Sequence, residues 1–73
     1  MNPLEPLVEC YSGVAYAERP IAFQWEGTRH PVSAILARWI APGLRCFRVT
    51  TPDGRRFELA YLEALDEWRV DPL

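Results

Sequence analysis

The feature that most restricts the fold of this chain is a short alternating run that ends in a glycine turn. Ile21, Phe23 and Trp25 alternate with smaller or polar residues, which is the two-residue spacing of a strand with one buried face. Gly27 follows closely and accepts a positive φ without steric strain, so the chain is expected to reverse there. The run therefore predicts a strand and, after the turn, an antiparallel partner over residues 29–40.

The segment 29–40 allows two interpretations. Its large apolar residues recur at the spacing of an amphipathic helix: Val32, Ile35, Leu36, Trp39 and Ile40. As a strand, the same segment would be apolar or small on both faces, which suits a strand covered on both sides or one with a bulge that swaps faces. We predict the strand, because the preceding turn favours immediate pairing with residues 21–25.

Further strands are predicted over residues 7–12, 44–51, 55–61 and 67–70. The turn Pro52-Asp53-Gly54 places proline at the second position of a type I turn and glycine at a left-handed position, so residues 47–51 should pair with the strand that follows. Asp71 and Pro72 are expected to end the last strand. Six large aromatic residues are predicted to form the core: Phe23, Trp25, Trp39, Phe47, Phe57 and Trp68.

Together these segments predict one all-β domain over residues 1–73, with residues 1–6 frayed because their prolines cannot donate to a sheet. Five or six antiparallel strands would form a meander that curls into a bent sheet or a small SH3-like barrel. A chain of this length buries only about 60% of its unfolded surface. Since 49% of its residues are hydrophobic, a homodimer that covers surplus apolar surface is one expected arrangement.

A set of residues spread over most of the chain resembles a family of short uncharacterised bacterial proteins. The set comprises Tyr16-Ala17-Glu18-Arg19-Pro20, Phe23, Trp25, Gly27, Arg29, Val32, Ile35, Arg38-Trp39, Phe47-Arg48-Val49, Asp53-Gly54 and Trp68. The resemblance implies an all-β fold and no catalytic residues. Because some relatives are encoded beside genes for Y-family lesion-bypass DNA polymerases, it also implies a DNA-repair context. The chain departs from the family pattern at His30-Pro31 and at Leu62.

The charged residues define a candidate binding face. The net charge of −2 and the pI of about 5.2 lack the overall positive charge of a nucleic-acid binder, yet all eight cationic residues are arginine, which contacts phosphate through two parallel hydrogen bonds. With aromatic rings as stacking platforms, such residues can bind single strands. The candidate binding residues are Tyr11, Tyr16, Arg19, Arg38, Arg48, Arg55 and Arg56, with Trp25 and Arg29 beside them.

Residues that could carry catalysis or hold a metal are few. Cys10 and Cys46 lack CxxC spacing and His30 is the only histidine, so we predict neither a metal site nor a cofactor. A cysteine and histidine dyad is not expected, because thiols within strands are usually inert and His30 should be an exposed ring after a turn. The four glycines are isolated, which excludes a phosphate-binding loop. We predict that the chain is not an enzyme.

Two functions follow as expectations. The first is a small interaction domain that acts by protein contact, as a homodimer or docked on a larger protein, with the segment 16–20 as a possible edge for an added strand. The alternative is a nucleic-acid-binding accessory protein that uses the arginine and tyrosine face in DNA repair. With no signal peptide and no apolar run near the roughly 20 residues of a membrane span, a cytoplasmic location is expected.

Overall fold

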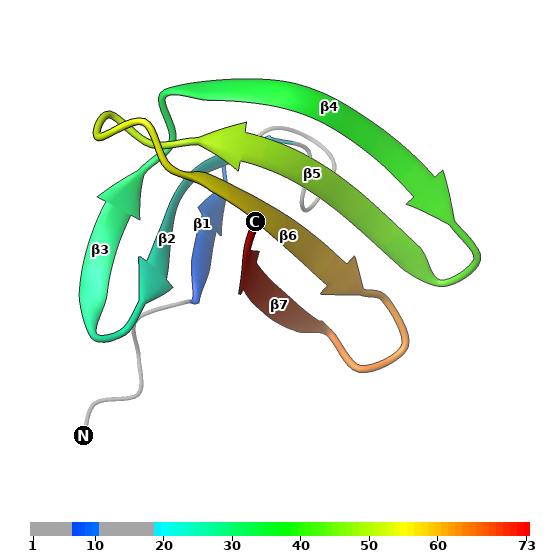
Figure 1. Ribbon diagram of the computed structural model, residues 1–73. Coiled ribbons are helices and arrows are strands. Elements are labelled where there is room, and N and C mark those ends of the chain that lie inside the picture. Colours follow the sequence, from blue (N-terminus) through cyan, green and yellow to red (C-terminus); the bar gives the residue numbers. More distant parts are fainter. Residues whose placement is uncertain (1–6, 11–18) are drawn as a thin grey trace.

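The computed structural model describes residues 7–10 and 19–73, which form seven strands in two antiparallel sheets (Figure 1). The strands are β1 (Val8–Cys10), β2 (Pro20–Trp25), β3 (Thr28–Pro31), β4 (Ala34–Ala41), β5 (Leu44–Thr50), β6 (Arg56–Leu62) and β7 (Glu67–Pro72). One sheet has the order β1-β2-β3 and the other the order β4-β5-β6-β7. The predicted all-β class and meander order are therefore confirmed, with seven strands in place of five or six and with two sheets that do not close into a barrel.

The first sheet contains the alternating run from which the sequence analysis started. β2 and β3 pair from Ala22 opposite Pro31 to Trp25 opposite Thr28. Glu26 and Gly27 both have positive φ, of 50° and 78°, which is the backbone of the two-residue turn that matches the twist of a hairpin. The predicted reversal is confirmed. Ile21 was expected on the buried face but is exposed, whereas its neighbour Ala22 is buried.

The predicted single strand over residues 29–40 is wrong, because the segment forms two strands in different sheets. Pro31 ends β3, since it has no N–H to continue a ladder. The next two amides then bond to opposite sheets: Val32 N donates to Ile21 O at 2.9 Å, and Ser33 N donates to Thr50 O at 2.7 Å. The segment is extended on both sides of this crossing, so the strand interpretation is confirmed over the helical one.

The second sheet follows the predicted turns. β5 and β6 pair from Thr50 opposite Arg56 onward, and Gly54 N donates to Thr51 O at 2.9 Å across the turn, with Gly54 at φ 85°. The Thr51 hydroxyl donates to the Asp53 carboxylate, and this bond holds the pKa of Asp53 below its usual value. These contacts confirm the predicted hairpin.

The last strand is longer than predicted. β7 continues through Asp71 and Pro72, and Pro72 lies opposite Phe57. Proline is tolerated there because β7 is an edge strand of its sheet, so one side of its backbone needs no ladder partner.

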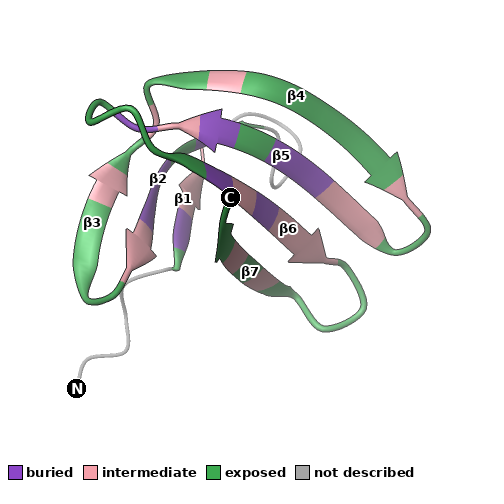
Figure 2. Ribbon diagram, in the orientation of Figure 1, coloured by how far each residue is buried: buried purple, intermediate pink, exposed green. Residues whose placement is uncertain are grey.

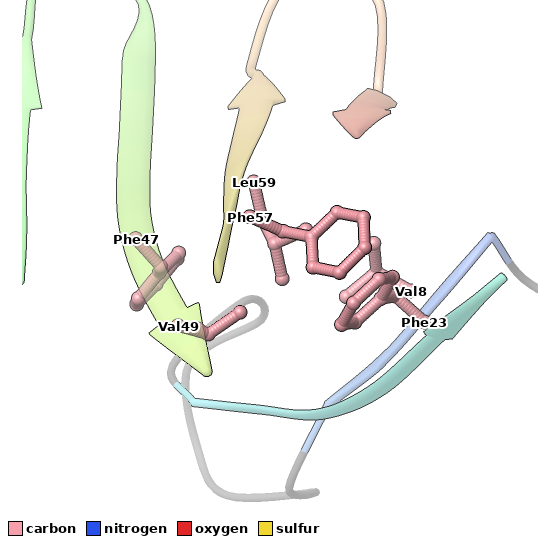
Figure 3. Close-up of a cluster of buried hydrophobic side chains, with 6 residues drawn as sticks. All are labelled: Val8, Phe23, Phe47, Val49, Phe57 and Leu59. Atoms are coloured by element: carbon pink, nitrogen blue, oxygen red, sulfur yellow. The ribbon is translucent and has the colours of Figure 1, made fainter. Parts of the chain in front are cut away.

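The core lies between the two sheets. Its buried cluster comprises Val8, Phe23, Phe47, Val49, Phe57 and Leu59. Figure 3 shows Val8 and Phe23 from the first sheet directed toward Phe57 and Leu59 of β6, with Phe47 and Val49 on β5 beside them. The rings of Phe23 and Phe57 meet edge to face with centroids 4.8 Å apart, a favoured aromatic geometry. This contact joins the two sheets.

Two of the six predicted core aromatics are only partly enclosed and a third lies outside the core. Trp25 and Trp68 are half-buried and pack against the cluster. Trp39 is 37% exposed and belongs to β4, which is almost entirely exposed along its length (Figure 2). Its predicted place in the core is therefore wrong, and the physical reason is a bulge described below.

Truncation of Phe57 should remove most of the contact between the sheets. We expect Phe57→Ala to lower the free energy of unfolding by about 3–5 kcal/mol, since Phe57 is fully buried and its loss leaves a cavity. Leu65→Ala, at a residue that is 61% exposed in the β6–β7 turn, is the matched control and should change it by less than about 0.5 kcal/mol. Urea unfolding followed by tryptophan fluorescence measures both. Equal effects of the two changes would contradict the placement of the core.

Candidate interaction surface

The most unusual surface of the described chain is the edge strand β4. It is the longest strand and the first in the order of its sheet, so one side of its backbone has no neighbouring strand within the described residues. Six of its eight residues are exposed. Leu36, Trp39 and Ile40 are 51%, 37% and 76% exposed, and they are the only large apolar residues of one element to be exposed together in the described chain. Such concentrated apolar exposure makes β4 a candidate contact site.

A β-bulge at Leu36 decides which side chains β4 presents on each face. Ile35 lies opposite Val49 and Ala37 lies opposite Arg48, so Leu36 has no partner in β5. An inserted residue shifts the alternation of the strand by one position. Ile35 therefore packs against the core, whereas the odd-numbered residues after the bulge turn to the outer face of the sheet. This shift carries Trp39 out of the core.

On the outer face, the row formed by Ala37, Trp39 and Ala41 carries no charge. Trp39 lies opposite Cys46 and next to Arg48, whose guanidinium carbon is 5.5 Å from the centre of the indole ring. This distance is within the range of a cation–π contact. We call this uncharged row, together with Leu36 and Ile40, the β4 surface.

Arg48, a predicted binding residue, is already engaged. Its Nη2 atom donates to Glu58 Oε1 at 3.3 Å, between two adjacent strands of the sheet. Such an exposed pair stabilises the fold by at most about 1 kcal/mol, but together with the Trp39 contact it orients the guanidinium along the sheet. Arg48 therefore lies at the border of the β4 surface.

Arg19 and Arg38 are brought together by the crossing between the sheets. Both line an open pocket of about 450 Å³, together with Pro20, Ile21, Val32, Ser33, Ala34 and Ile35. Among the described residues, this lining supplies two guanidinium groups and one side-chain hydroxyl, and no carboxylate. This set of groups suits a small anion. The pocket lies on the core side of β4, on the opposite face from the row Ala37, Trp39 and Ala41.

The remaining predicted binding residues lie elsewhere. Arg55 and Arg56 lie at the start of β6, and the Arg55 guanidinium carbon is 5.0 Å from the centre of the Phe57 ring. Tyr11 and Tyr16, and most of the predicted edge segment 16–20, lie outside the described residues. The five described members of the predicted set therefore occupy three separate places and do not form one face.

Two further arginines are paired with glutamates. Arg29 donates to both carboxylate oxygens of Glu9, at 2.8 and 3.0 Å, and Arg45 donates to Glu63 at 2.8 Å. The hydrogen bond from Arg29 holds the pKa of Glu9 below its usual value. Together with Arg48, three of the eight arginines are thus matched locally by carboxylates. Local pairing of this kind lowers the positive potential available to a phosphate backbone.

The two thiols and the imidazole of the chain are buried or half-buried. Cys10 and Cys46 are free thiols, and burial raises the pKa of each, with the Glu58 carboxylate raising that of Cys46 further. His30 was expected to be exposed but is half-buried and stacks on Phe23 at 5.5 Å. Among residues 7–10 and 19–73, no three His, Cys, Asp or Glu side chains are grouped to hold a metal ion, and no helix has the length and apolarity to cross a membrane.

The exposure of Leu36 and Ile40 was not expected from the sequence, because the apolar residues of this segment were predicted to be buried. One signal in the sequence was available. A strand that is apolar on both faces, yet belongs to a chain with only one core, must leave one face exposed unless a partner covers it.

The thiol of Cys46 can report on the cover that Trp39 provides. Cys46 is only 5% exposed although it points to the outer face, where Trp39 is its neighbour on β4. With Cys10→Ser as background, we expect slow alkylation by iodoacetamide at pH 8, since a raised pKa leaves little thiolate. Trp39→Ala should accelerate the reaction several-fold, whereas Leu65→Ala should leave it unchanged. A rate that does not respond to Trp39→Ala would contradict this placement.

Comparison with known proteins finds no relative of this chain. No family model, no curated protein and no solved structure matches the chain. The resemblance to short bacterial proteins encoded near lesion-bypass polymerases therefore stays a prediction.

Proposed function

We propose that this chain is a non-enzymatic interaction domain that acts by protein contact through the β4 surface, and that it forms a homodimer. The observation that carries the proposal is the exposed apolar edge of β4, with Ile40 at 76% exposure and Leu36 and Trp39 beside it. As part of this proposal the protein acts in the cytoplasm, a reducing compartment in which Cys10 and Cys46 stay thiols.

The size of the chain supports a second copy as the partner. A 73-residue chain has one small core, and a domain of this size is only marginally stable without further burial. Full burial of one large apolar side chain contributes about 1.5–3 kcal/mol. A two-fold contact uses the β4 surface of both copies, so each buried residue contributes once on each copy. Association therefore adds to the stability of both copies.

The distribution of charge supports protein contact as well. Within β4 the only charged residue is Arg38, and it lines the pocket on the core side of the strand. The outer row of β4 is uncharged, and the charged residues of the outer face begin on β5 with Arg48 and its partner Glu58. An apolar centre bordered by charged residues is the usual anatomy of a protein interface.

Mass as a function of concentration tests the proposal. Between about 10 µM and 1 mM, light scattering should show the mass rising from 8.4 kDa toward twice that value. Ile40→Arg should keep the chain monomeric over this range, because association would bury an unpaired guanidinium. Leu65→Arg introduces the same charge at a similarly exposed leucine outside β4 and should leave association unchanged. A wild-type chain that stays at 8.4 kDa, or equal effects of both variants, would contradict the homodimer.

A second candidate function is a nucleic-acid-binding accessory protein in DNA repair. The support for it is that two guanidinium groups, Arg19 and Arg38, line one pocket. Arg55 and Arg56 add a second positive position, and neither has an ion-pair partner in the described part of the chain. A phosphate backbone is the polyanion that two such positions would fit.

Salt dependence decides this second candidate. If it holds, labelled single-stranded DNA should bind at about 50 mM salt and bind far more weakly at about 200 mM, because phosphate contacts release counterions. Arg38→Ala should weaken binding, and Arg55→Ala with Arg56→Ala should weaken it further. Arg45→Ala is the control, since Arg45 is paired with Glu63 at another end of the sheet. At about 50 mM salt electrostatic attraction is stronger than at about 200 mM. Absence of binding there would contradict nucleic-acid binding and leave protein contact as the remaining proposal.

A further inference from the structure

We infer that two copies of this chain join edge to edge through antiparallel β4 strands, with Trp39 on the two-fold axis. The two four-stranded sheets then form one continuous sheet of eight strands. This inference rests on the proposed homodimer and goes beyond it, because it names the mode of pairing and the register. Three observations support it: the comparison of the sheet edges, the spacing of Arg38, and the small residues that flank Trp39.

β4 is the one described sheet edge that lacks protection against pairing. β1 has only three residues, and β3 has four and ends in Pro31. β7 carries Pro72 and three charged residues, which are Glu67, Arg69 and Asp71. Short length, proline and charge are the means by which edge strands avoid pairing with other chains. β4 has eight residues, no proline and a single charge, so it is the edge best suited to accept another strand.

The two-fold symmetry limits the register. Opposite residues of an antiparallel pair point to the same face, so the two-fold axis must pass through a residue that lies opposite its own copy. Within the regular part of β4, residues 37–41, three central residues are available for this position. The three registers place Arg38 opposite Arg38, Trp39 opposite Trp39, or Ile40 opposite Ile40. The first sets like charges against each other, which is unfavourable. The third sets Arg38 opposite Pro42, which has no N–H to donate, and shortens the pairing.

The register centred on Trp39 uses the whole segment 37–41. It places Arg38 opposite Ile40 of the second copy, so that the aliphatic stem of arginine can cover the most exposed apolar residue of β4. The two Arg38 side chains then lie diagonally, two residues apart along the strands. No like charges stand opposite each other.

Trp39 has room for its counterpart in this register. Its neighbours on the outer face of β4 are Ala37 and Ala41, and Ala37 of one copy lies opposite Ala41 of the other. Small residues on both sides of each indole leave space for the two rings to lie offset, which is a favoured aromatic geometry. The small-large-small sequence of this row is therefore complementary to itself under a two-fold axis.

Single cysteines read the register directly. The background is Cys10→Ser with Cys46→Ser, which removes the two native thiols. Opposite residues of a strand pair lie close enough for a disulfide, whereas residues two positions out of register do not. Under mild oxidation we expect Trp39→Cys to give at least about ten-fold more covalent dimer than Arg38→Cys or Ile40→Cys. Light scattering of each reduced variant shows whether it still associates before oxidation.

A second measurement keeps Trp39 in place. Ala37→Cys and Ala41→Cys should each give little covalent dimer alone but should form a mixed disulfide when the two variants are combined. Preferred cross-linking at Arg38→Cys or Ile40→Cys would overturn this register. A dimer by mass that none of these cysteines cross-links, as in packing of the outer sheet faces, would overturn edge pairing and leave the proposed homodimer standing. A chain that is monomeric by mass would end both proposals.

Discussion

Two consecutive amides control the architecture of this protein. Val32 N donates to Ile21 O in the first sheet, and Ser33 N donates to Thr50 O in the second, so the chain changes sheets within one peptide unit. This crossing sets the two sheets against each other over a single aromatic core. It also places the beginning of β4 at the border between the sheets, where Arg19 and Arg38 line the same pocket. The core, the pocket and the exposed edge all depend on it.

The β-bulge at Leu36 lies a few residues after this crossing, and it decides which side chains of β4 are on the outer face. If the strand alternated regularly through Leu36, Trp39 would share the face of Ile35 and point toward the core. With the bulge, the indole lies on the outer face beside Arg48, and Ile40 stays exposed on the other face. The bulge thus places on the surface a tryptophan that regular alternation would have put in the core. Exposed apolar side chains are unfavourable in water, and a second chain that covers them removes this cost. This is the basis of the proposed homodimer.

The arginines show how composition and arrangement differ. An all-arginine set of cations is compatible with phosphate recognition, but Arg29, Arg45 and Arg48 are each paired with a glutamate. Of the cations without such a partner in the described chain, Arg38 lies in the middle of β4, whereas Arg55 and Arg56 lie at the start of β6. The proposal of protein contact therefore rests on neighbouring residues of one strand, whereas nucleic-acid binding would depend on separated positive positions.

The sequence by itself determined the local elements. The alternation in β2, the turn at Gly27 and the hairpin turn at Pro52-Asp53-Gly54 follow from φ preferences and side-chain spacing, which act within a few residues. Only the tertiary structure decided how residues 28–41 divide between two sheets and which face Trp39 occupies. Those outcomes depend on a hydrogen bond from Ser33 to Thr50 and on a bulge against β5, contacts between residues far apart in the chain. Periodicity alone contains no information about such partners, so the exposed β4 surface emerged only from the fold.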